Sequence, residues 1–322
     1  MDKIRILTVA LPADEEKRAR LETLLPDTKI VYTQFMKATR EEVLRSDIIF
    51  GNVLPDHLRE TRNIKWIQLA SAGSDRYVKY LPAKTLLTNA TGAYGGAISE
   101  HMLAMLLAAQ KKLFLYHENM KAEKWWREGT VQGIEGSVVL CVGLGDIGGK
   151  FAKKAKALGA YTIGVRRADT RKPDFIDELY TTESLDELLP RADIVALSLP
   201  KGPETDGIMD ERRISMMKKG SIFINVGRGS AVDQDALVRA LNSEHLGYAC
   251  LDVTTPDPLP KGNPLWTAKN LILTPHSAGG WTLPSTLDEV YNLFERNLHA
   301  FLGGEPLANL VDPATGYRRT PL

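Results

Sequence analysis

The sequence predicts an α/β protein with two units, each built on a parallel β-sheet. Three observations predict this fold class. The chain has 322 residues, which is more than one small core accommodates. Apolar strand-like runs alternate with helical segments, an order that needs helical crossovers between parallel strands. Two long helical segments, near the middle and the end of the chain, separate the two alternating series.

The first series is expected to hold strands separated by helices, followed by a long helix. The strands are expected at residues 3–10, 28–34, 47–53, 64–71 and 85–91, and the helices at 13–25, 38–46 and 55–63. Residues 97–120 are expected to form one helix, and its first half, apolar on nearly every side, is expected to be buried all round.

The second series repeats the alternation, and a long helix then ends the pattern. Strand-like runs occur at 138–142, 162–167, 191–200, 220–228, 247–253 and 270–275, and the final helix is expected at 283–304.

Composition and charge exclude several classes of protein. The chain is 43% hydrophobic and 25% charged, and its 41 basic and 40 acidic residues give a net charge of +1. This balance provides no basic field for nucleic acid or an anionic membrane, and no apolar run approaches the length of a membrane helix. Cys141 and Cys250 lie in strand-like runs and are expected to be buried free thiols. A cytoplasmic enzyme is therefore expected, and no metal ligands are predicted.

A glycine motif begins the second series. The strand at 138–142 runs directly into Gly143-Leu144-Gly145-Asp146-Ile147-Gly148, and a helix follows it. In this context Gly143 permits a tight turn, Gly145 allows a pyrophosphate to approach the backbone, and Gly148 allows close packing of helix on strand. The helix start then offers free N–H groups to phosphate. The motif predicts a dinucleotide-binding Rossmann unit; a plain strand–helix turn is the alternative.

The end of the next strand bears on the choice of dinucleotide. An NAD site usually has an acidic residue there, which holds the ribose hydroxyls. This chain instead has Arg166 and Arg167, whose guanidinium groups suit a 2′-phosphate. The pattern favours NADP, with NAD as the alternative if Asp169 holds the ribose.

Polar residues follow the remaining strands at the ends where ligands bind in open parallel sheets. Thr205 is placed to touch ribose or phosphate, Arg228 lies between two glycines, and Asp252 ends a strand. Asp257 and His276 follow the last two strands. The other histidines, His57, His101, His117, His245 and His299, are interpreted as structural or solvated. Convergence of Arg228, Asp257 and His276 at one sheet edge predicts a catalytic site.

These motifs, in this order and spacing, resemble the D-isomer-specific 2-hydroxyacid dehydrogenases, including their glyoxylate/hydroxypyruvate reductase members. The resemblance extends over nearly the whole chain and rests on NATGAYGGAISEHMLAMLLAAQKKL, KWW, GLGDIG, NVGRGS, LDVTTPDPLP and TPHSAGG. It implies two Rossmann-like domains: a discontinuous, flavodoxin-like substrate domain at 1–97 and 284–322, and a dinucleotide-binding domain at 98–283. It also implies a homodimer, formed largely through the dinucleotide-binding domain.

The resemblance further implies a reaction and its residues. A 2-oxo acid is reduced to a D-2-hydroxy acid, with Arg228 holding the substrate, His276 as acid/base and Asp257 supporting the imidazole. The family usually has Glu at that third position, so the shorter Asp257 implies a closer loop, a bridging water or a weaker pair. The expected dinucleotide contacts are Gly143, Gly145, Asp146, Ile147, Gly148, Arg166, Arg167, Thr205, Val226, Gly227, Arg228, Asp252, His276 and Ala278.

A second set of residues is expected to contact the substrate. The loop Ser71-Ala72-Gly73 follows a strand, and its small residues allow backbone N–H groups to face a carboxylate. Asn52, Tyr94 and Trp281 are expected to shape the same pocket. The substrate stays open between glyoxylate or hydroxypyruvate, a branched 2-oxo acid and an aryl pyruvate. A dinucleotide-sensing corepressor on the same fold is the alternative function.

Overall fold

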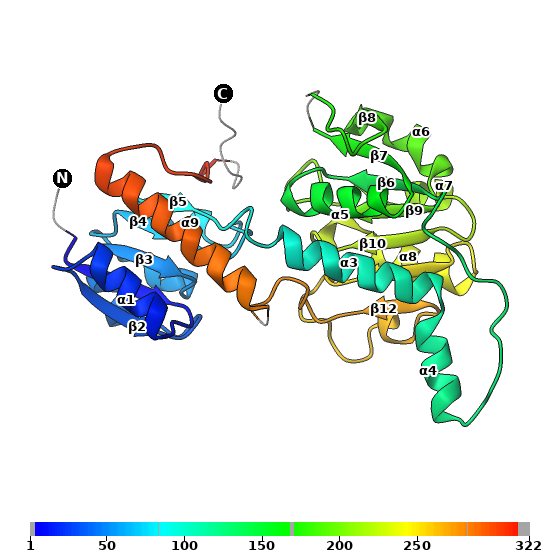
Figure 1. Ribbon diagram of the computed structural model, residues 1–322, viewed down its shortest axis with the longest axis horizontal. Helices are drawn as coiled ribbons and strands as arrows, with labels where there is room; N and C mark the ends of the chain where they lie inside the picture. The colour runs from blue at the N-terminus through cyan, green and yellow to red at the C-terminus, as the bar shows by residue number, and fades with distance from the viewer. Residues whose placement is uncertain (1–3, 83, 168–170, 282, 315–322) are drawn as a thin grey trace. The chain divides into compact units, whose positions relative to one another are not determined.

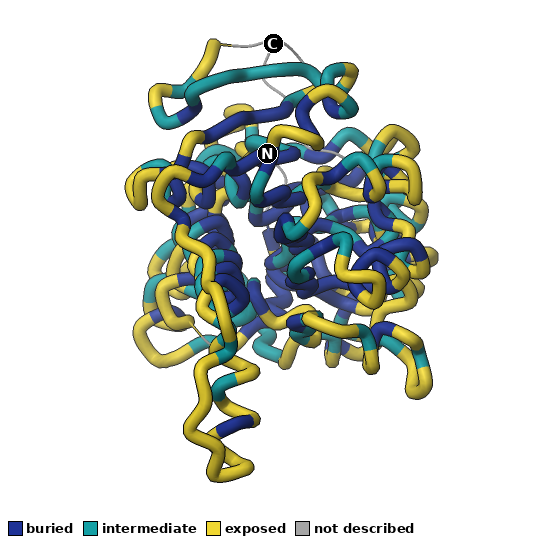
Figure 2. The backbone as a smooth tube through the Cα atoms, turned by 90° about the vertical axis from the view of Figure 1, so that its right-hand side faces the viewer, coloured by how far each residue is buried: buried dark blue, intermediate teal, exposed yellow. Residues whose placement is uncertain are grey.

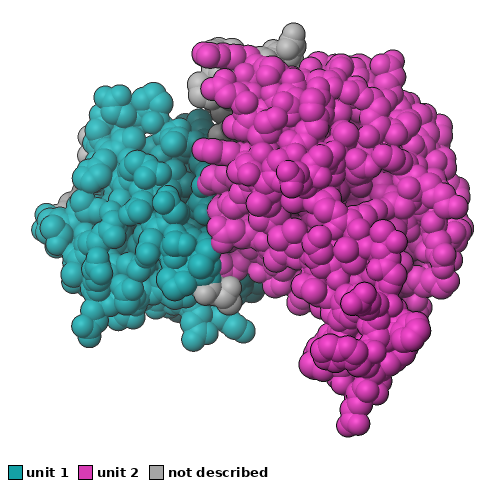
Figure 3. Space-filling view, turned by 45° about the vertical axis from the view of Figure 1, so that its right-hand side comes forward, with its two compact units in different colours: residues 1–94, 281–322 teal, residues 95–280 magenta. Residues whose placement is uncertain are grey.

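The computed structural model describes residues 4–82, 84–167, 171–281 and 283–314. The chain divides into two compact units (Figures 1 and 3). Unit 1 comprises Met1–Tyr94 with Trp281–Leu322, and unit 2 comprises Gly95–Gly280. The sequence places these divisions after residues 97 and 283. Both units have a parallel sheet with helices, so the predicted α/β class is confirmed.

Unit 1 contains a five-stranded parallel sheet in the order β2-β1-β3-β4-β5, which is the flavodoxin-like order. All four residues of β3 are buried, as is typical of a central parallel strand. The elements are β1 Ile6–Ala10, α1 Glu15–Leu24, β2 Lys29–Thr33, α2 Arg40–Arg45, β3 Ile48–Gly51, β4 Trp66–Gln68, β5 Leu86–Thr88 and α9 Pro284–Gly303, with 3₁₀ turns η1 Pro55–Leu58 and η2 Val78–Tyr80. The helix predicted at 55–63 is wrong, because only the turn η1 forms there.

Helix α9, which is distant in sequence, completes unit 1 by packing on its sheet (Figure 1). Phe294 stacks on Phe50 with 4.0 Å between ring centroids and on Trp66 with 5.2 Å. All three rings are fully buried. Aromatic burial of this kind is a large apolar contribution, so the discontinuous unit is held together by its core.

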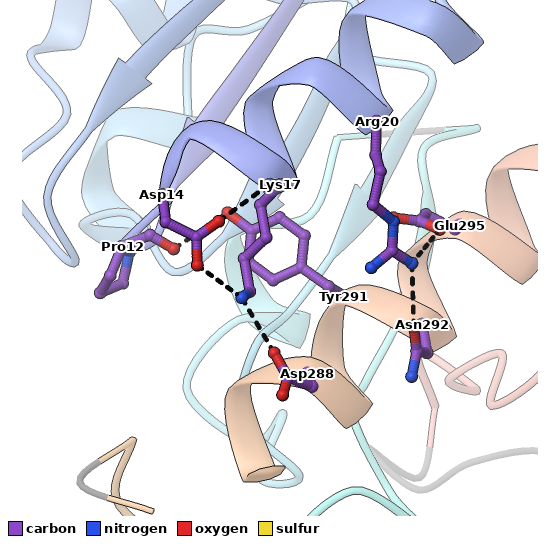
Figure 4. A network of polar contacts seen from close by, with 8 residues as sticks. All are labelled: Pro12, Asp14, Lys17, Arg20, Asp288, Tyr291, Asn292 and Glu295. Atoms are coloured by element: carbon purple, nitrogen blue, oxygen red, sulfur yellow. Dashed lines mark hydrogen bonds and ion pairs between the residues drawn. The ribbon is translucent and has the colours of Figure 1, made fainter. Parts of the chain in front are cut away.

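Polar contacts join α9 to α1 at the edge of that core (Figure 4). Lys17 Nζ lies 2.8 Å from Asp14 Oδ2 and 2.9 Å from Asp288 Oδ1. The hydrogen bond to Asp14, followed by that to Asp288, raises the pKa of Lys17 above its ordinary value. Arg20 reaches Glu295 of α9 at 2.6 Å. Because Lys17 is largely buried, its ammonium charge would be costly without a partner, and the contacts with Asp14 and Asp288 offset that cost.

Unit 2 contains a seven-stranded parallel sheet in the order β12-β11-β10-β9-β6-β7-β8. This is the Rossmann order extended by one strand. Its elements are α3 Gly95–Gln110, α4 Leu113–Lys121, β6 Val138–Val142, α5 Asp146–Ala157, β7 Tyr161–Arg166, β8 Glu178–Thr181, α6 Leu185–Leu188, β9 Ile194–Leu197, α7 Glu211–Met216, β10 Ile222–Asn225, α8 Gln234–Asn242, β11 Tyr248–Leu251 and β12 Leu271–Leu273, with 3₁₀ turns η3 Thr182–Ser184, η4 Leu189–Arg191, η5 Gly229–Ala231 and η6 Pro264–Thr267. Strand β8, at the sheet edge, is absent from the sequence prediction.

Alternate residues of β6 face opposite layers of helices. Val139 and Cys141 belong to the apolar cluster that includes residues of α3 and α5. Leu140 and Val142 belong to the cluster that includes residues of α6, α7 and α8. This period of two produces cores on both faces of the sheet, as a parallel sheet requires.

The single helix predicted at 97–120 is wrong, because α3 and α4 are separate helices. Lys112 between them has φ of 55°, in the left-handed region. The break is held by the returning segment, since Lys111 Nζ donates to Gln132 O at 2.8 Å and Lys112 Nζ donates to Glu128 O. Nor is the first half buried all round: Glu100 and Ala104 are exposed, because only one side of α3 packs on the sheet.

Both cysteines are buried and free, as predicted. Burial raises the pKa of each thiol to about 12, so both stay protonated at neutral pH.

None of the described helices has the length and apolar character needed to cross a membrane.

Candidate active site

The predicted catalytic residues follow three neighbouring strands of unit 2. Arg228 follows β10, Asp257 lies in the loop after β11, and His276 lies just beyond β12. These strands are adjacent and parallel, so their carboxyl ends share one sheet edge. Loops at that edge are where ligands bind in open α/β sheets.

His276 and Asp257 form a direct pair. Nδ1 of His276 lies 2.6 Å from Oδ2 of Asp257, with half of the histidine side chain and 32% of the aspartate side chain exposed. Of the three arrangements that the shorter carboxylate implied, the loop therefore sits close enough for contact without a bridging water. A carboxylate on Nδ1 fixes the ring orientation and leaves Nε2 for a ligand.

The loop that carries His276 is bound to Asp252. The backbone N–H of His276 donates to Asp252 O at 2.9 Å. The N–H groups of Ser277 and Ala278 donate to the Asp252 carboxylate at 2.9 and 3.1 Å. Asp252 is only 3% exposed, so the structure assigns its carboxylate an internal anchoring contact. The sequence predicts a dinucleotide contact for Asp252, and that role stays a prediction.

Arg228 lies between β10 and η5 in extended backbone, and its Nη1 donates to Gly227 O at 2.9 Å. The flanking glycines have a reason within the chain itself. A Cβ on Gly227 would lie 2.4 Å from Leu199 O, and one on Gly229 would lie 2.1 Å from the carbonyl carbon of Thr254. Close packing of three loops therefore requires both glycines and presents the Arg228 side chain from a rigid base.

The glycine turn matches the geometry predicted for it. Gly143 has φ of 96°, which favours glycine, and a Cβ on Gly148 would lie 1.9 Å from Gly143 O. A Cβ on Gly145 would meet nothing within 4 Å. The position is open, and it lies at the start of α5, where Asp146, Ile147 and Gly148 contribute first-turn N–H groups. The turn therefore fits a pyrophosphate.

The Asp146 side chain makes its contacts within unit 2. Its Oδ2 accepts from the N–H of Gly95 at 2.7 Å, and its Oδ1 lies 2.9 Å from Lys150 Nζ. A Cβ on Gly95 would collide with this carboxylate. The first-turn N–H of Asp146, rather than its side chain, is thus the group suited to a phosphate.

The other predicted dinucleotide contacts have varied surroundings. Arg166 is the last residue of β7 and half-buried, and Arg167 beside it is exposed. Asp169, the alternative ribose ligand, lies outside the described residues. The Thr205 hydroxyl donates within its own loop to Pro200 O at 2.7 Å. Val226, which precedes Gly227, is buried.

In unit 1, the loop after β4 has the backbone arrangement expected of an anion site. Among the described residues, the N–H groups of Ala72 and Gly73 have no hydrogen-bond acceptor. The Ser71 hydroxyl donates to Gly73 O at 2.8 Å and accepts from Asn52 Nδ2 at 3.0 Å. Asn52 is buried and also accepts from Ala70 N at 3.0 Å. Asn52 therefore holds the loop in place through these two hydrogen bonds.

An aromatic group flanks this loop. The Tyr94 hydroxyl donates to Ala70 O and accepts from Trp281 Nε1 at 3.2 Å. Burial raises the pKa of Tyr94 to about 12, so its hydroxyl remains a donor at neutral pH. Trp281 packs edge-on against Phe35 with centroids 4.8 Å apart. Phe35 is missing from the sequence prediction, because nothing local relates residues this distant in sequence.

His101, like Phe35, makes a contact that the sequence did not predict. Its Nε2 lies 3.1 Å from Oγ1 of Thr274, which is 173 residues away. Thr274 begins the loop that carries His276. No sequence signal separates His101 from a structural helix histidine.

No cluster of three or more His, Cys, Asp or Glu side chains suited to a metal ion occurs within residues 4–82, 84–167, 171–281 and 283–314.

The fold and the glycine turn define unit 2 as a dinucleotide-binding domain of the kind found in oxidoreductases. Residues 103–278 match the family described as D-isomer specific 2-hydroxyacid dehydrogenase, NAD binding domain. The chain belongs to the D-isomer specific 2-hydroxyacid dehydrogenases, and it is an NAD(P)-dependent oxidoreductase of that class.

Three similar proteins illustrate this membership. A glyoxylate reductase of Aeropyrum pernix is 34% identical over 70% of this chain and 69% of its own. The structure of a D-isomer specific 2-hydroxyacid dehydrogenase family protein from Aeromonas salmonicida covers 96% of this chain and 99% of its own, with a TM-score of 0.85 and 30% identity. An NADPH-dependent glyoxylate/hydroxypyruvate reductase from Sinorhizobium meliloti, in complex with NADP and sulfate, covers 97% of this chain and 100% of its own, with a TM-score of 0.81 and 25% identity.

Proposed function

We propose that this protein reduces a 2-oxo acid to the D-2-hydroxy acid with NADPH, and catalyses the reverse reaction. The observation that carries the proposal is the direct contact of 2.6 Å between His276 Nδ1 and Asp257 Oδ2 at the ligand-binding edge of a dinucleotide fold. A carboxylate-oriented imidazole is suited to giving a proton to a developing alkoxide. The corepressor alternative is not favoured, since the relatives named above are reductases and dehydrogenases.

Each catalytic residue has a separate task in the proposed reaction. Asp257 accepts from the Nδ1–H of His276, so the neutral ring keeps its proton on Nδ1 and the second proton of the imidazolium is carried on Nε2. Nε2 protonates the substrate oxygen on reduction and takes the proton back on oxidation. When bound, the nicotinamide supplies or accepts the hydride. Its pyrophosphate would be held at the open turn of Gly145 and the first N–H groups of α5.

Each unit by itself offers one group of the kind that binds a carboxylate. Arg228 offers a planar fork of donors, which can bind two oxygens at once. In unit 1, the N–H groups of Ala72 and Gly73 offer a backbone nest. Glyoxylate and hydroxypyruvate are the first substrates to test, because named relatives reduce them. A steady-state panel should add branched and aryl 2-oxo acids, and absence of turnover with every 2-oxo acid would overturn the proposal.

Asp257→Asn should lower kcat substantially, because it removes the charge that stabilises the imidazolium. Asp257→Glu should retain much of the activity, since the chain's family usually has the longer carboxylate. We expect a loss of roughly tenfold to a hundredfold for Asn, a charge-assisted hydrogen bond contributing about 1.5–3 kcal/mol. Steady-state kcat for both variants checks this. Equal and negligible effects would show that Asp257 is an ordinary loop residue.

The parent enzyme should have a higher kcat/KM with NADPH than with NADH, by about tenfold or more. Arg166 and Arg167 at the end of β7 are the groups that would bind the 2′-phosphate. Changing both to Ala should erase the preference, chiefly through KM, because the 2′-phosphate is far from the reacting carbon. Steady-state kinetics of the parent and the variant with NADPH and with NADH measure the ratio of the two kcat/KM values.

A matched control removes two other charges. Lys153 and Lys219 are exposed in unit 2, so their replacement by Ala lowers the net charge equally. That variant should keep the parental preference for NADPH. A parent that prefers NADH would refute the assignment.

We infer that the protein is a homodimer and that α4 and the segment after it form part of the interface. Exposed apolar side chains gather there, on the part of unit 2 that extends at the lower right of Figure 3 and is coloured mostly exposed in Figure 2. They are Leu113, Phe114, Leu115, Met120, Trp125, Trp126 and Val131. Such a set in one short segment indicates a protein contact.

Sedimentation of the parent at micromolar concentration should give the mass of two chains. Replacing Trp125 and Trp126 by Ser should shift it toward one chain, because their apolar area would no longer be buried. Trp266→Ser, another exposed tryptophan, is the control and should leave the mass unchanged. A monomeric parent would contradict the inference.

The cytoplasmic location stays a prediction from the sequence.

A further inference from the structure

His101 is connected to the loop that carries His276 through the Thr274 hydroxyl, its nearer polar contact, and its Nε2 also lies 3.9 Å from Asp252 Oδ1. Nε2 of His101 lies 3.1 Å from Thr274 Oγ1, and Thr274 Oγ1 donates to Asp252 Oδ1 at 2.6 Å. A hydroxyl has one proton to donate, so Thr274 accepts from His101 while it donates to Asp252. The contact therefore requires an N–H on Nε2 of His101.

Asp252 in turn accepts hydrogen bonds from the backbone around His276. Its carboxylate accepts from the N–H groups of Ser277 and Ala278, and its carbonyl accepts from the N–H of His276. Three successive N–H groups thus end on one buried residue. Any rotation of the Asp252 carboxylate would disturb the two bonds that follow His276.

The loop needs this support, because His276 has φ of 53°. Left-handed backbone is unfavourable for a residue with a side chain, and it persists where surrounding contacts determine it. The bonds from Asp252 are such contacts, and they keep the imidazole facing Asp257. His101 lies outside that pair, since among the described residues its polar partners are Thr274 and Asp252.

We propose that His101 is a positioning residue, which acts through Thr274 and Asp252 to hold the loop of His276 in its active conformation. It is half-buried, with 25% of its side chain exposed, and its ring is placed by α3. Its task is to donate one hydrogen bond that fixes the Thr274 hydroxyl. The proposal rests on the proposed function, since it assumes that His276 transfers the proton.

Two substitutions separate this role from simple packing. His101→Leu fills the space without a donor and should lower kcat for 2-oxo acid reduction roughly tenfold, the effect of one positioning hydrogen bond. His101→Gln retains an N–H donor near the Nε2 position and should recover most of that loss. KM for the 2-oxo acid should change little in either variant. Dinucleotide Kd, measured by fluorescence titration, should change far less than kcat, because the phosphate-binding turn of Gly145 is untouched.

A double-mutant cycle with Thr274→Val gives the sharpest result. If His101 acts through Thr274, His101→Leu combined with Thr274→Val should lower kcat no further than Thr274→Val alone. Additive losses, or an equal loss with Gln and Leu at position 101, would overturn the proposal. Thermal unfolding of each variant identifies any that fail to fold, and His101→Gln then still decides. A parent with no 2-oxo acid turnover would instead count against the proposed function.

Discussion

Replacing His276 by Ala should lower kcat for 2-oxo acid reduction by roughly 10²- to 10⁴-fold, the range for loss of a general acid. The imidazole is the group that Asp257 orients, and the alanine variant has no proton donor in its place. The fold should persist, because half of the side chain is exposed. Steady-state kinetics at saturating NADPH measure kcat, and fluorescence titration should show dinucleotide Kd nearly unchanged.

A control histidine makes this result specific. His299 is exposed on α9 in unit 1, so His299→Ala should leave kcat at the parental value. If His276→Ala kept near-parental turnover, another group would be the acid and the proposed role of His276 would be wrong.

Replacing Arg228 by Gln should lower kcat/KM for the 2-oxo acid by about 10²-fold or more. The guanidinium is proposed to hold two substrate oxygens, and each hydrogen bond to a charged group contributes about 1.5–3 kcal/mol. The loss should appear in KM for the acid and in kcat, because the same fork would orient the carbonyl. KM for NADPH should change far less.

Lysine at position 228 is the informative companion. Arg228→Lys keeps the charge but not the planar fork, so its activity should lie between the parent and Arg228→Gln. Gly227 and Gly229 remain in both variants, so the packing against Leu199 and Thr254 is preserved. A glutamine variant with parental KM for every accepted 2-oxo acid would exclude Arg228 from substrate binding.

Local patterns predicted most of the fold and part of the site. The spacing of Gly143, Gly145 and Gly148 between a strand and a helix describes a turn whose geometry is set within a few residues, and the structure shows that geometry. The alternation of apolar runs likewise predicts parallel strands, since each helical crossover is read from its own segment. The same alternation predicts that Arg228 and His276 lie at the carboxyl ends of strands.

Other features depended on residues that are distant in the sequence. The break at Lys112 arises from contacts with the returning segment, although the run of helix-forming residues continues through it. Strand β8 forms at the sheet edge by pairing with β7. Helical propensity is a weak preference that tertiary contacts override, so neither feature was visible locally.

The sequence by itself determined the α/β class, the dinucleotide turn and the residue types at the strand ends, because these depend on backbone geometry over short stretches. Only the tertiary structure decided which of those side chains touch. The direct contact of Asp257 with His276, 19 residues apart, follows from how two loops meet after β11 and β12. The contact of His101 with Thr274 spans 173 residues. Sheet order and helix packing decide which of these residues meet. Both depend on interactions throughout the unit, so neither local segment reveals the contact.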